Sequence, residues 1–409
     1  MNLDIDHVRS CFPQASDSFV YCSNAGGSFV AAPVLDLMEQ YNRRMRIQPY
    51  APFSPSREGG EAMDRARERW CAALNISDDE LTIGPSTSAN SYTMAHAIGA
   101  GLSPGDEIIV CQQDHEANHG PWRRMAEAQG LKLKQWDVDP DTGLLDPSSL
   151  DGLLGERTRW VFFTHCSNLV GTTNPVREIV DRIRAASPAR VCVDGVAHTP
   201  HHIPDLRALD VDMYLFSLYK VYGPHQGILY VRRDLHESLA PQSHEFLAHL
   251  PNKRYNPAGP QHAQVAASAG VIDYFEGLMA HHGISEPTLT AGLDALHQVI
   301  AAHEAQLAAP IVDYLHQSPD VQLLGKGHVR DGDRAPTIAF RPRVKSSAEV
   351  ASAMQAEAVG AEHGDFYAGR VLDGMGIDRR AGVVRLSLVH YNTVNEAQKI
   401  VAALDRALA

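Results

Sequence analysis

The feature of this sequence that most constrains its fold is the regular alternation of short apolar runs with amphipathic stretches. Buried strands are predicted over Glu107–Cys111, Trp160–Thr164, Arg190–Val193, Met213–Ser217 and Gly227–Val231. Helical patterns cover Gly60–Leu74, Ala89–Ile98, Gly120–Gln129 and Val176–Ala186. This alternation is typical of an α/β protein whose mostly parallel sheet is covered by helices on both faces. Ligands of such sheets bind at the carboxyl ends of the strands.

The last third of the chain has a different pattern. A long helix is predicted over Leu289–His316, followed by strands and helices over Thr337–Pro342, Ser347–Val359, Gly382–Val389 and Val394–Ala407. These elements indicate a smaller α+β domain. We therefore expect a large domain over residues 21–284, and a small domain made of residues 1–20 and 285–409.

Composition narrows the class of protein. A formal net charge of −13 argues against nucleic acid or an anionic membrane as partner. No run approaches the roughly 18–20 apolar residues of a membrane span, and charges near the N-terminus are unlike a signal peptide. The six cysteines form no CxxC pair, so neither a disulfide framework nor a zinc site is indicated. These observations predict a cytoplasmic protein.

The stretch from Val193 to Gly227 carries the chemistry. Asp194 closes one apolar strand, and Lys220 follows another 26 residues later. Neighbouring strands would thus present a carboxylate and an amine to one cleft. Pyridoxal 5′-phosphate (PLP) needs both, because the lysine amine forms an imine with it and the carboxylate keeps its ring nitrogen protonated. An isolated Asp or Lys is usually a solvated surface residue, and that alternative stays open at this point.

The order and spacing of VDG (193–195), SLYK (217–220) and YGP (222–224) are specific. In them the chain resembles the class V aminotransferase superfamily of PLP fold type I, on its cysteine-desulfurase-like branch. The resemblance extends over nearly the whole chain. It implies a large domain with a mostly parallel seven-stranded sheet, PLP as cofactor and a homodimer. It also implies that Lys220 is the Schiff-base lysine and that Asp194 pairs with the ring nitrogen.

Further cofactor contacts follow from the same resemblance. GPSTSAN (84–90) opens a helix, and the backbone N–H groups with the hydroxyls of Ser86, Thr87 and Ser88 would hold the phosphate, Thr87 being the best match. A capping turn without a ligand would look the same. Ser217 and Tyr219 beside the lysine are further expected contacts. In HCSNLVGTTNPV (165–176), Asn168 would bind the phenolic oxygen, although asparagine is also common in turns.

His115 in DHEANHGPW (114–122) matches the histidine that stacks on the cofactor ring. It could instead be a polar residue at a helix start, or form a metal pair with His119. No third ligand has matching spacing, so we predict no metal site. On the substrate side the resemblance places Asn24, His198 and Arg385, whose fork-shaped guanidinium suits an α-carboxylate. An arginine on a strand that merely reaches solvent is the alternative.

The chain departs from the desulfurases in several positions. No cysteine follows Cys192, whereas a desulfurase carries its nucleophilic cysteine in the C-terminal third. Ala197 and Tyr219 replace a glutamine and a histidine of the usual pattern. Pro260 stands where a partner subunit's threonine often completes the phosphate site.

The segments DGVA (194–197), FSLYKVYGPH (216–225) and VRLSLVHYNTVNE (384–396) also resemble fungal PLP-dependent decarboxylative aldolases. We therefore expect a PLP-dependent lyase that uses Lys220, His115 and Asp194. It would act at the β-carbon of an aspartate- or cysteine-sulfinate-like amino acid, giving an alanine enamine that is protonated or coupled to an aldehyde. A cysteine or selenocysteine lyase, an aminotransferase and a non-catalytic PLP-binding protein are the alternatives. Arg57 and Arg370 are either contacts for a second carboxylate or surface residues.

Overall fold

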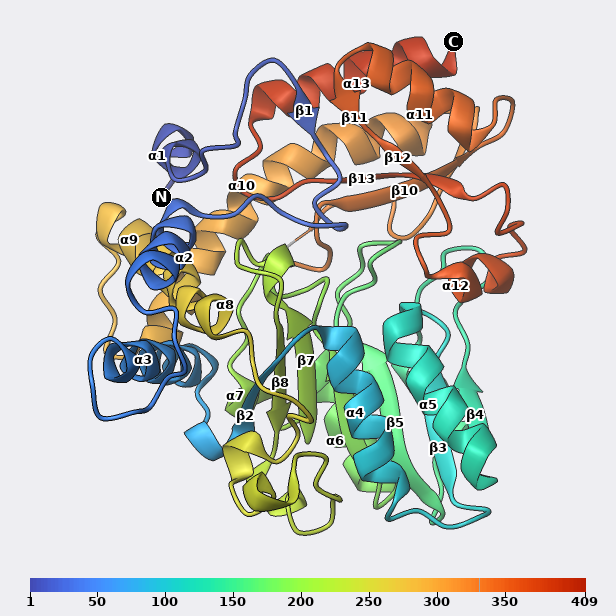
Figure 1. Cartoon of the computed structure of the whole chain (residues 1–409). Helices are drawn as coiled ribbons and strands as arrows, with labels where there is room; N and C mark the ends of the chain where they lie inside the picture. Colours follow the sequence, from blue (N-terminus) through green and yellow to red (C-terminus); the bar gives the residue numbers. More distant parts are fainter. Residues whose placement is uncertain (331) are drawn as a thin grey trace.

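A seven-stranded sheet with helices on both faces forms the body of the protein, and a smaller domain lies above one edge of it (Figure 1). The computed structural model describes residues 1–330 and 332–409. The strands, in spatial order, are β2 (Leu81–Gly84), β8 (Gly227–Val231), β7 (Met213–Ser217), β6 (Arg190–Asp194), β5 (Thr158–Thr164), β3 (Glu107–Cys111) and β4 (Lys132–Trp136). Only β8 runs against its neighbours in this sheet. The predicted α/β class and mostly parallel sheet are confirmed.

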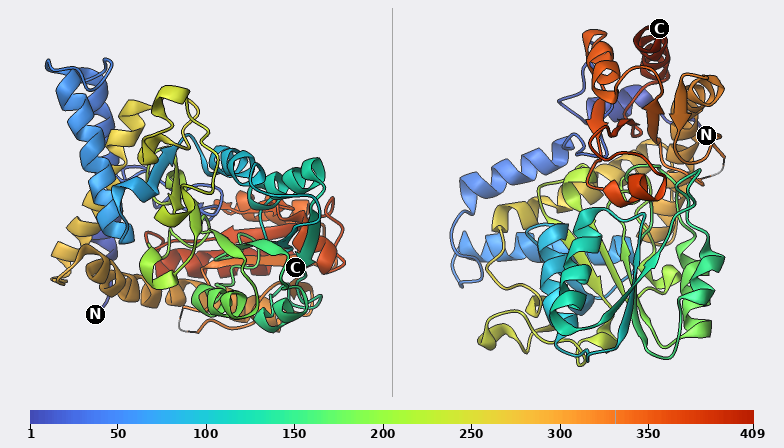
Figure 2. Two further views of the ribbon diagram at one scale, coloured as in Figure 1. Left: turned by 90° about the horizontal axis from the view of Figure 1, so that it is seen from below. Right: turned by 90° about the vertical axis from the view of Figure 1, so that its right-hand side faces the viewer.

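Alternating side chains of the strands point to opposite faces, and a separate set of helices covers each face. In β3, Ile108 and Val110 pack with α4 (Thr87–Gly99) and α5 (Glu116–Gln129). Ile109 and Cys111 belong to the core under α3 (Ser56–Leu74), α6 (Val176–Ala186) and α9 (Ala269–His281). Figure 2 shows α4 and α6 on opposite sides of the sheet. Burial on both faces explains why these strands read as continuous apolar runs.

The smaller domain is built on an antiparallel sheet in the order β12 (Glu362–Gly364), β13 (Val383–Ser387), β10 (Thr337–Pro342), β9 (Val321–Leu323). Helices α11 (Ser347–Ala356) and α13 (Val394–Leu408) cover it. Near the N-terminus, β1 (Val20–Tyr21) pairs with β11 (Val359–Gly360). The long helix α10 (Leu289–Gln317) spans both cores, because Leu293 packs in the large core and Leu307 in the small one. The domain division at residue 284 stays a prediction.

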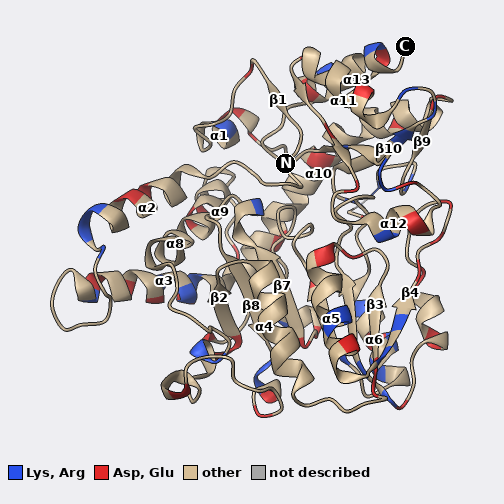
Figure 3. Ribbon diagram, turned by 45° about the vertical axis from the view of Figure 1, so that its right-hand side comes forward, with Lys and Arg blue, Asp and Glu red and all other residues tan. Residues whose placement is uncertain are grey.

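The other described helices are short or peripheral: α1 (Ile5–Ser10), α2 (Ala32–Arg44), α7 (Leu206–Leu209), α8 (His262–Ala267) and α12 (Gly369–Gly374). In the view of Figure 3, acidic and basic residues are interspersed over the elements. None of the described helices combines the length and the apolar character that crossing a membrane would need.

Candidate active site

A cavity at the carboxyl edge of the large sheet gathers most of the predicted cofactor residues. Asp194 is the last residue of β6, and Ser217 is the last residue of the neighbouring β7. Lys220 ends the single turn η3 (Leu218–Lys220) that follows β7. The predicted residues lining the cavity are Thr87, Ser88, His115, Asn168, Asp194, Ser217, Tyr219 and Lys220. They converge because the carboxyl ends of parallel strands meet at one edge of a sheet.

Lys220 and Asp194 are both buried in this cavity. Burial and the positive charge of Arg385 lower the pKa of the Lys220 amine to about 8, while Asp194 acts in the opposite direction. Burial raises the pKa of Asp194 to about 6, although its Oδ1 accepts a hydrogen bond of 2.9 Å from Val196 N. The lysine amine is therefore partly uncharged near neutral pH, the form in which it is a nucleophile or a base.

The start of α4 forms a polar cradle beside Lys220. Ser86 is the N-cap of the helix, and the Thr87 and Ser217 hydroxyls are 2.7 Å apart. Gly227 on β8 lies directly behind this turn, where an added Cβ would come within 2.5 Å of Thr87 N. Glycine thus lets the helix start approach the sheet. Free backbone N–H groups at such a start attract a phosphate.

His115 is the N-cap residue of α5, and its Nδ1 accepts a hydrogen bond of 3.0 Å from Ala117 N. This bond assigns the proton of the neutral ring to Nε2. Burial, followed by the positive charges of Lys220 and Arg385, lowers the pKa of His115 to about 3. The imidazole is therefore neutral at physiological pH and can lie flat against an aromatic ring.

Asn168 follows β5 and has one polar atom without a partner. Its Nδ2 donates to Phe366 O at 2.9 Å, whereas its Oδ1 is buried and has no hydrogen-bond partner among the described residues. A buried polar atom left unpaired in the protein is costly and indicates a group that comes from outside the chain.

Arg385 on β13 belongs to the small domain, yet it contacts Asn168, which lines the cavity. Its Nη1 donates to Asn168 O at 3.1 Å, and its Cζ lies 3.9 Å from the centroid of the Phe366 ring. Its Nε is buried without a partner in the described chain. Burial lowers its pKa to about 10, so the guanidinium remains charged at neutral pH. Its open donor suits a substrate carboxylate.

These residues fit PLP. Lys220 and Asp194 line one cavity, the start of α4 provides an anion cradle, and His115 offers a neutral flat ring. The unpaired Oδ1 of Asn168 lies in the same cavity.

Comparison with known families decides the identity of this site. The class-V aminotransferase family matches residues 20–400. The chain belongs to this family. It is a PLP-dependent class-V enzyme with fold type I.

Two fungal proteins and one bacterial structure illustrate the range of this class-V enzyme's relatives. The aminotransferase-like protein FGM3 of Gibberella zeae is 33% identical, covering 100% of this chain and 99% of that protein. The cysteine desulfurase-like protein ustD of Aspergillus flavus is 29% identical over 98% and 90% of the two chains. The structure of the Escherichia coli cysteine desulfurase CsdA superimposes with a TM-score of 0.84 at 22% identity, covering 100% and 99% of the chains. The last likeness shows the fold.

Besides Arg385, which reaches the cofactor cavity of the class-V enzyme through Asn168, three predicted residues do not line that cavity. The Ser86 hydroxyl accepts from Ala89 N and caps α4. The Asn24 amide donates to Ser387 O at 2.9 Å and accepts from the Tyr391 hydroxyl, so it anchors its loop to the small domain. The third residue, His198, lies on the far side of a turn.

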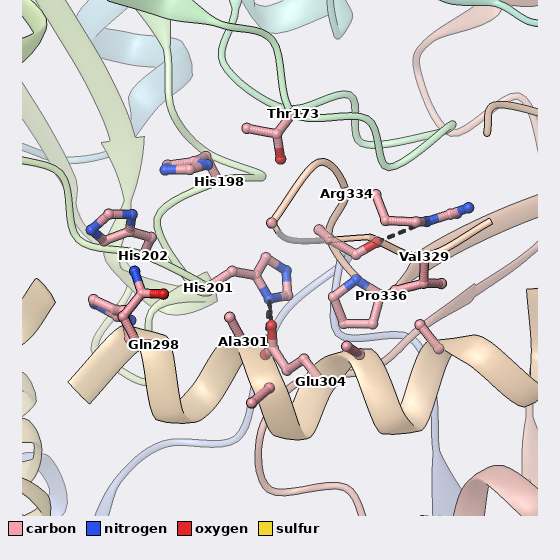
Figure 4. Close-up of a pocket in the computed structure, with 16 residues that line it drawn as sticks. Thr173, His198, His201, His202, Gln298, Ala301, Glu304, Val329, Arg334 and Pro336 are labelled. Carbon is pink, nitrogen blue, oxygen red and sulfur yellow. Dashed lines mark hydrogen bonds and ion pairs between the residues drawn. The ribbon is translucent and has the colours of Figure 1, made fainter. Parts of the chain in front are cut away.

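The turn after Asp194 carries His198 away from the cofactor cavity. Its backbone N–H bonds Gly195 O at 3.0 Å, and its ring stacks on His165 with the centroids 3.5 Å apart. His198 instead lines a second cavity of about 410 Å³ between the large domain, α10, Val329 and residues 332–336 (Figure 4). The prediction that His198 contacts the substrate therefore has no support in this geometry.

In the second cavity two histidines pair with carboxylates, whereas His297 Nδ1 is buried without a partner among the described residues. His201 Nδ1 lies 2.9 Å from Glu304, and His202 Nε2 lies 2.8 Å from Asp294. Neither here nor elsewhere in the described residues do three side chains of metal-ligand type come together. His119 lies one turn after His115 in α5, and both of its ring nitrogens are buried without a partner among those residues.

Several neighbours of the cofactor cavity were missed by sequence reasoning. Cys166 lines it, although no spacing in the sequence marks this cysteine. Phe366 and Tyr367 approach it from the loop before α12, with φ angles of 52° and 58°. The left-handed region is uncommon for non-glycine residues, so no pattern predicts it. Arg370 is held by Glu116 at 2.6 Å.

Proposed function

We propose that this class-V enzyme cleaves a bond at the β-carbon of a small L-amino acid with an acidic β-group, such as aspartate or cysteine sulfinate. The carbon nucleophile left behind is protonated to alanine or coupled to an aldehyde. The observation that carries this proposal is the chemical state of the cysteines.

Cys166 is the cysteine that lines the cofactor cavity. It is 1% exposed, and burial raises the pKa of its thiol to about 12. Burial also raises the pKa of each of the other cysteines, which are Cys11, Cys22, Cys71, Cys111 and Cys192. Accepting sulfur from a substrate requires a thiolate. The site therefore favours β-groups that leave without a nucleophile, as CO₂ or as SO₂.

The chain's own residues divide the work as follows. Arg385 binds the α-carboxylate through its unpaired donor, and Asp194 pairs with the ring nitrogen of the cofactor. PLP bound there withdraws electrons from the substrate carbon. Lys220, with a pKa of about 8, can take up and return a proton at the α-carbon near neutral pH. With aspartate the net reaction consumes one proton and yields alanine and CO₂.

We further propose that the enzyme is a homodimer. Large apolar side chains are exposed on α2 and on the loop after it: Leu35, Ile47, Tyr50 and Phe53. An exposed apolar patch of this kind is typical of a protein–protein interface. Sedimentation of the PLP-loaded protein would test this, since a monomer at micromolar concentration contradicts it.

A product assay tests the reaction. PLP-loaded enzyme is given L-aspartate, L-cysteine sulfinate and L-cysteine separately, and alanine, CO₂, sulfite and sulfide are quantified with and without an aldehyde. Alanine with CO₂ or sulfite supports the proposal. A keto acid together with conversion of the cofactor to its amine form would make the protein an aminotransferase. Absence of turnover with a borohydride-reducible chromophore would indicate a non-catalytic PLP-binding protein.

A further inference from the structure

The segment before α12 joins three parts of the cofactor site. Phe366 covers the face of the Arg385 guanidinium, and the Phe366 carbonyl accepts from Asn168 Nδ2. Since Arg385 in turn donates to Asn168 O, the three residues form a closed set of contacts. Phe366 is thereby fixed beside the group that binds the substrate α-carboxylate.

Tyr367, the next residue, is fixed beside the cofactor's expected ring partner. Its carbonyl accepts from Glu116 N at 2.8 Å, at the first residue of α5. Its own N–H donates to Asp365 Oδ1 at 3.1 Å. Its ring centroid lies 5.4 Å from that of His115, at an interplanar angle of 52°.

Both residues are held in an unfavourable backbone conformation. Two consecutive non-glycine residues in the left-handed region persist only where their surroundings hold them, and such positions cluster at functional sites. The contacts to Asn168 and Glu116 provide that restraint. In this arrangement Tyr367 is 72% exposed, although burial of its large aromatic side chain would be energetically more favourable.

The position of this ring suggests what it contacts. Arg385 defines the end of the substrate that carries the α-carboxylate, and His115 defines the plane of the cofactor ring. Tyr367 lies beside the His115 ring, and the residue before it, Phe366, lies against the Arg385 guanidinium. A molecule that approaches the substrate carbon from solvent would therefore pass an exposed aromatic face.

We infer that Tyr367 determines specificity for the electrophile, and that it selects a planar, aromatic aldehyde. This inference rests on the β-cleavage proposed above. In the coupling step, the β-carbon left by CO₂ forms a bond to the aldehyde carbon, and a proton from solvent goes to the aldehyde oxygen. Aspartate, an aldehyde and one proton thus give CO₂ and a γ-hydroxy-α-amino acid. The ring of Tyr367 would stack on the aldehyde ring.

The test compares benzaldehyde with cyclohexanecarbaldehyde, which is similar in size but not planar. PLP-loaded enzyme receives L-aspartate and one aldehyde, and the ratio of coupled product to alanine is measured. We expect Tyr367→Asn to lower this ratio about 3- to 10-fold for benzaldehyde and less than 2-fold for cyclohexanecarbaldehyde. Asparagine tolerates the left-handed conformation, so the substitution removes the ring without adding backbone strain.

Two further variants sharpen the result. Tyr367→Phe keeps the ring and should hold the ratio within about 2-fold. Phe246→Asn removes another exposed aromatic ring, 70% accessible, in the segment after β8. Because β8 runs antiparallel, that segment begins at the opposite edge of the sheet, and the ratio should not change.

The outcomes separate the inference from the proposed function. Equal ratios for wild type and Tyr367→Asn, or equal losses for both aldehydes, overturn the role of Tyr367. Alanine and CO₂ without coupled product also overturn it but leave the β-cleavage standing. If no acidic substrate yields alanine, the β-cleavage itself is wrong and the inference falls with it.

Discussion

The two cavities of this protein differ in the kind of polar groups that line them. The second cavity measures about 410 Å³ and the cofactor cavity only about 50 Å³. In the larger one, His201 pairs with Glu304 and His202 with Asp294. A buried polar atom without a partner among the described residues occurs in both, His297 Nδ1 in the larger cavity and Asn168 Oδ1 in the smaller. The smaller cavity, however, brings an amine and a carboxylate, Lys220 and Asp194, to the carboxyl edge of the sheet. The kind of groups that line a cavity and their place at the strand ends, rather than its size, therefore mark the cofactor site.

Among changes to the two cavities, removing the lysine amine should have the largest effect on activity. Lys220→Ala should abolish the borohydride-reducible chromophore and lower alanine formation by about 10³-fold or more, because nucleophile and base are lost together. Absorbance spectra and the product assay measure this. Full activity in Lys220→Ala would show that the smaller cavity is not the catalytic site.

The arginine of the small domain should have the next largest effect. Arg385→Lys keeps the charge but loses the fork of donors, so kcat/KM should fall about 10- to 100-fold, mainly through a higher KM. Arg406→Lys, at an exposed pair with Glu357, is the matched control and should change little. An unchanged KM in Arg385→Lys would contradict the assignment of the α-carboxylate.

The pH dependence of cofactor uptake follows from the pKa of Lys220. Burial and Arg385 lower that pKa from 10.5 to about 8. The uncharged amine is the reactive form, so the rate at which the PLP-free protein takes up PLP should rise with pH through about 8. Arg385→Gln removes a positive charge, which raises the pKa of Lys220 and should move the midpoint to higher pH. Stopped-flow absorbance would measure both profiles, and a midpoint near 10 in the wild type would contradict this environment.

The smallest effect on activity is expected in the second cavity. Glu304→Gln should lower the free energy of unfolding by about 1–3 kcal/mol, because Glu304 is buried beside His201, and change kcat/KM less than 2-fold. Asp294→Asn, at a half-exposed partner of His202, should cost less than about 0.5 kcal/mol. Urea denaturation measures both. A large loss of activity in Glu304→Gln would mean that the second cavity contributes to catalysis.

Local patterns predicted the elements well but placed some helix starts too late. The predicted helix over Gly60–Leu74 begins at Ser56. Glycine is a poor helix former, yet Gly60 lies where an added Cβ would meet the Tyr50 ring at 2.6 Å. The helix predicted to start at Gly120 begins at Glu116 and continues through Pro121. There the Ser91 hydroxyl donates to Ala117 O, the carbonyl that Pro121 cannot bond.

The sequence by itself determined five strands of the large sheet, their burial on both faces, and the placement of Asp194 and Lys220 at one edge of that sheet. These follow from apolar periodicity and from the position of residues at strand ends, which are local properties. Tertiary structure decided the rest. It directed His198 into the second cavity, engaged the Asn24 amide with Ser387, and brought Phe366 and Tyr367 to the cofactor site. These contacts join residues far apart in the chain through loops whose conformations depend on their surroundings, so no local pattern contains them.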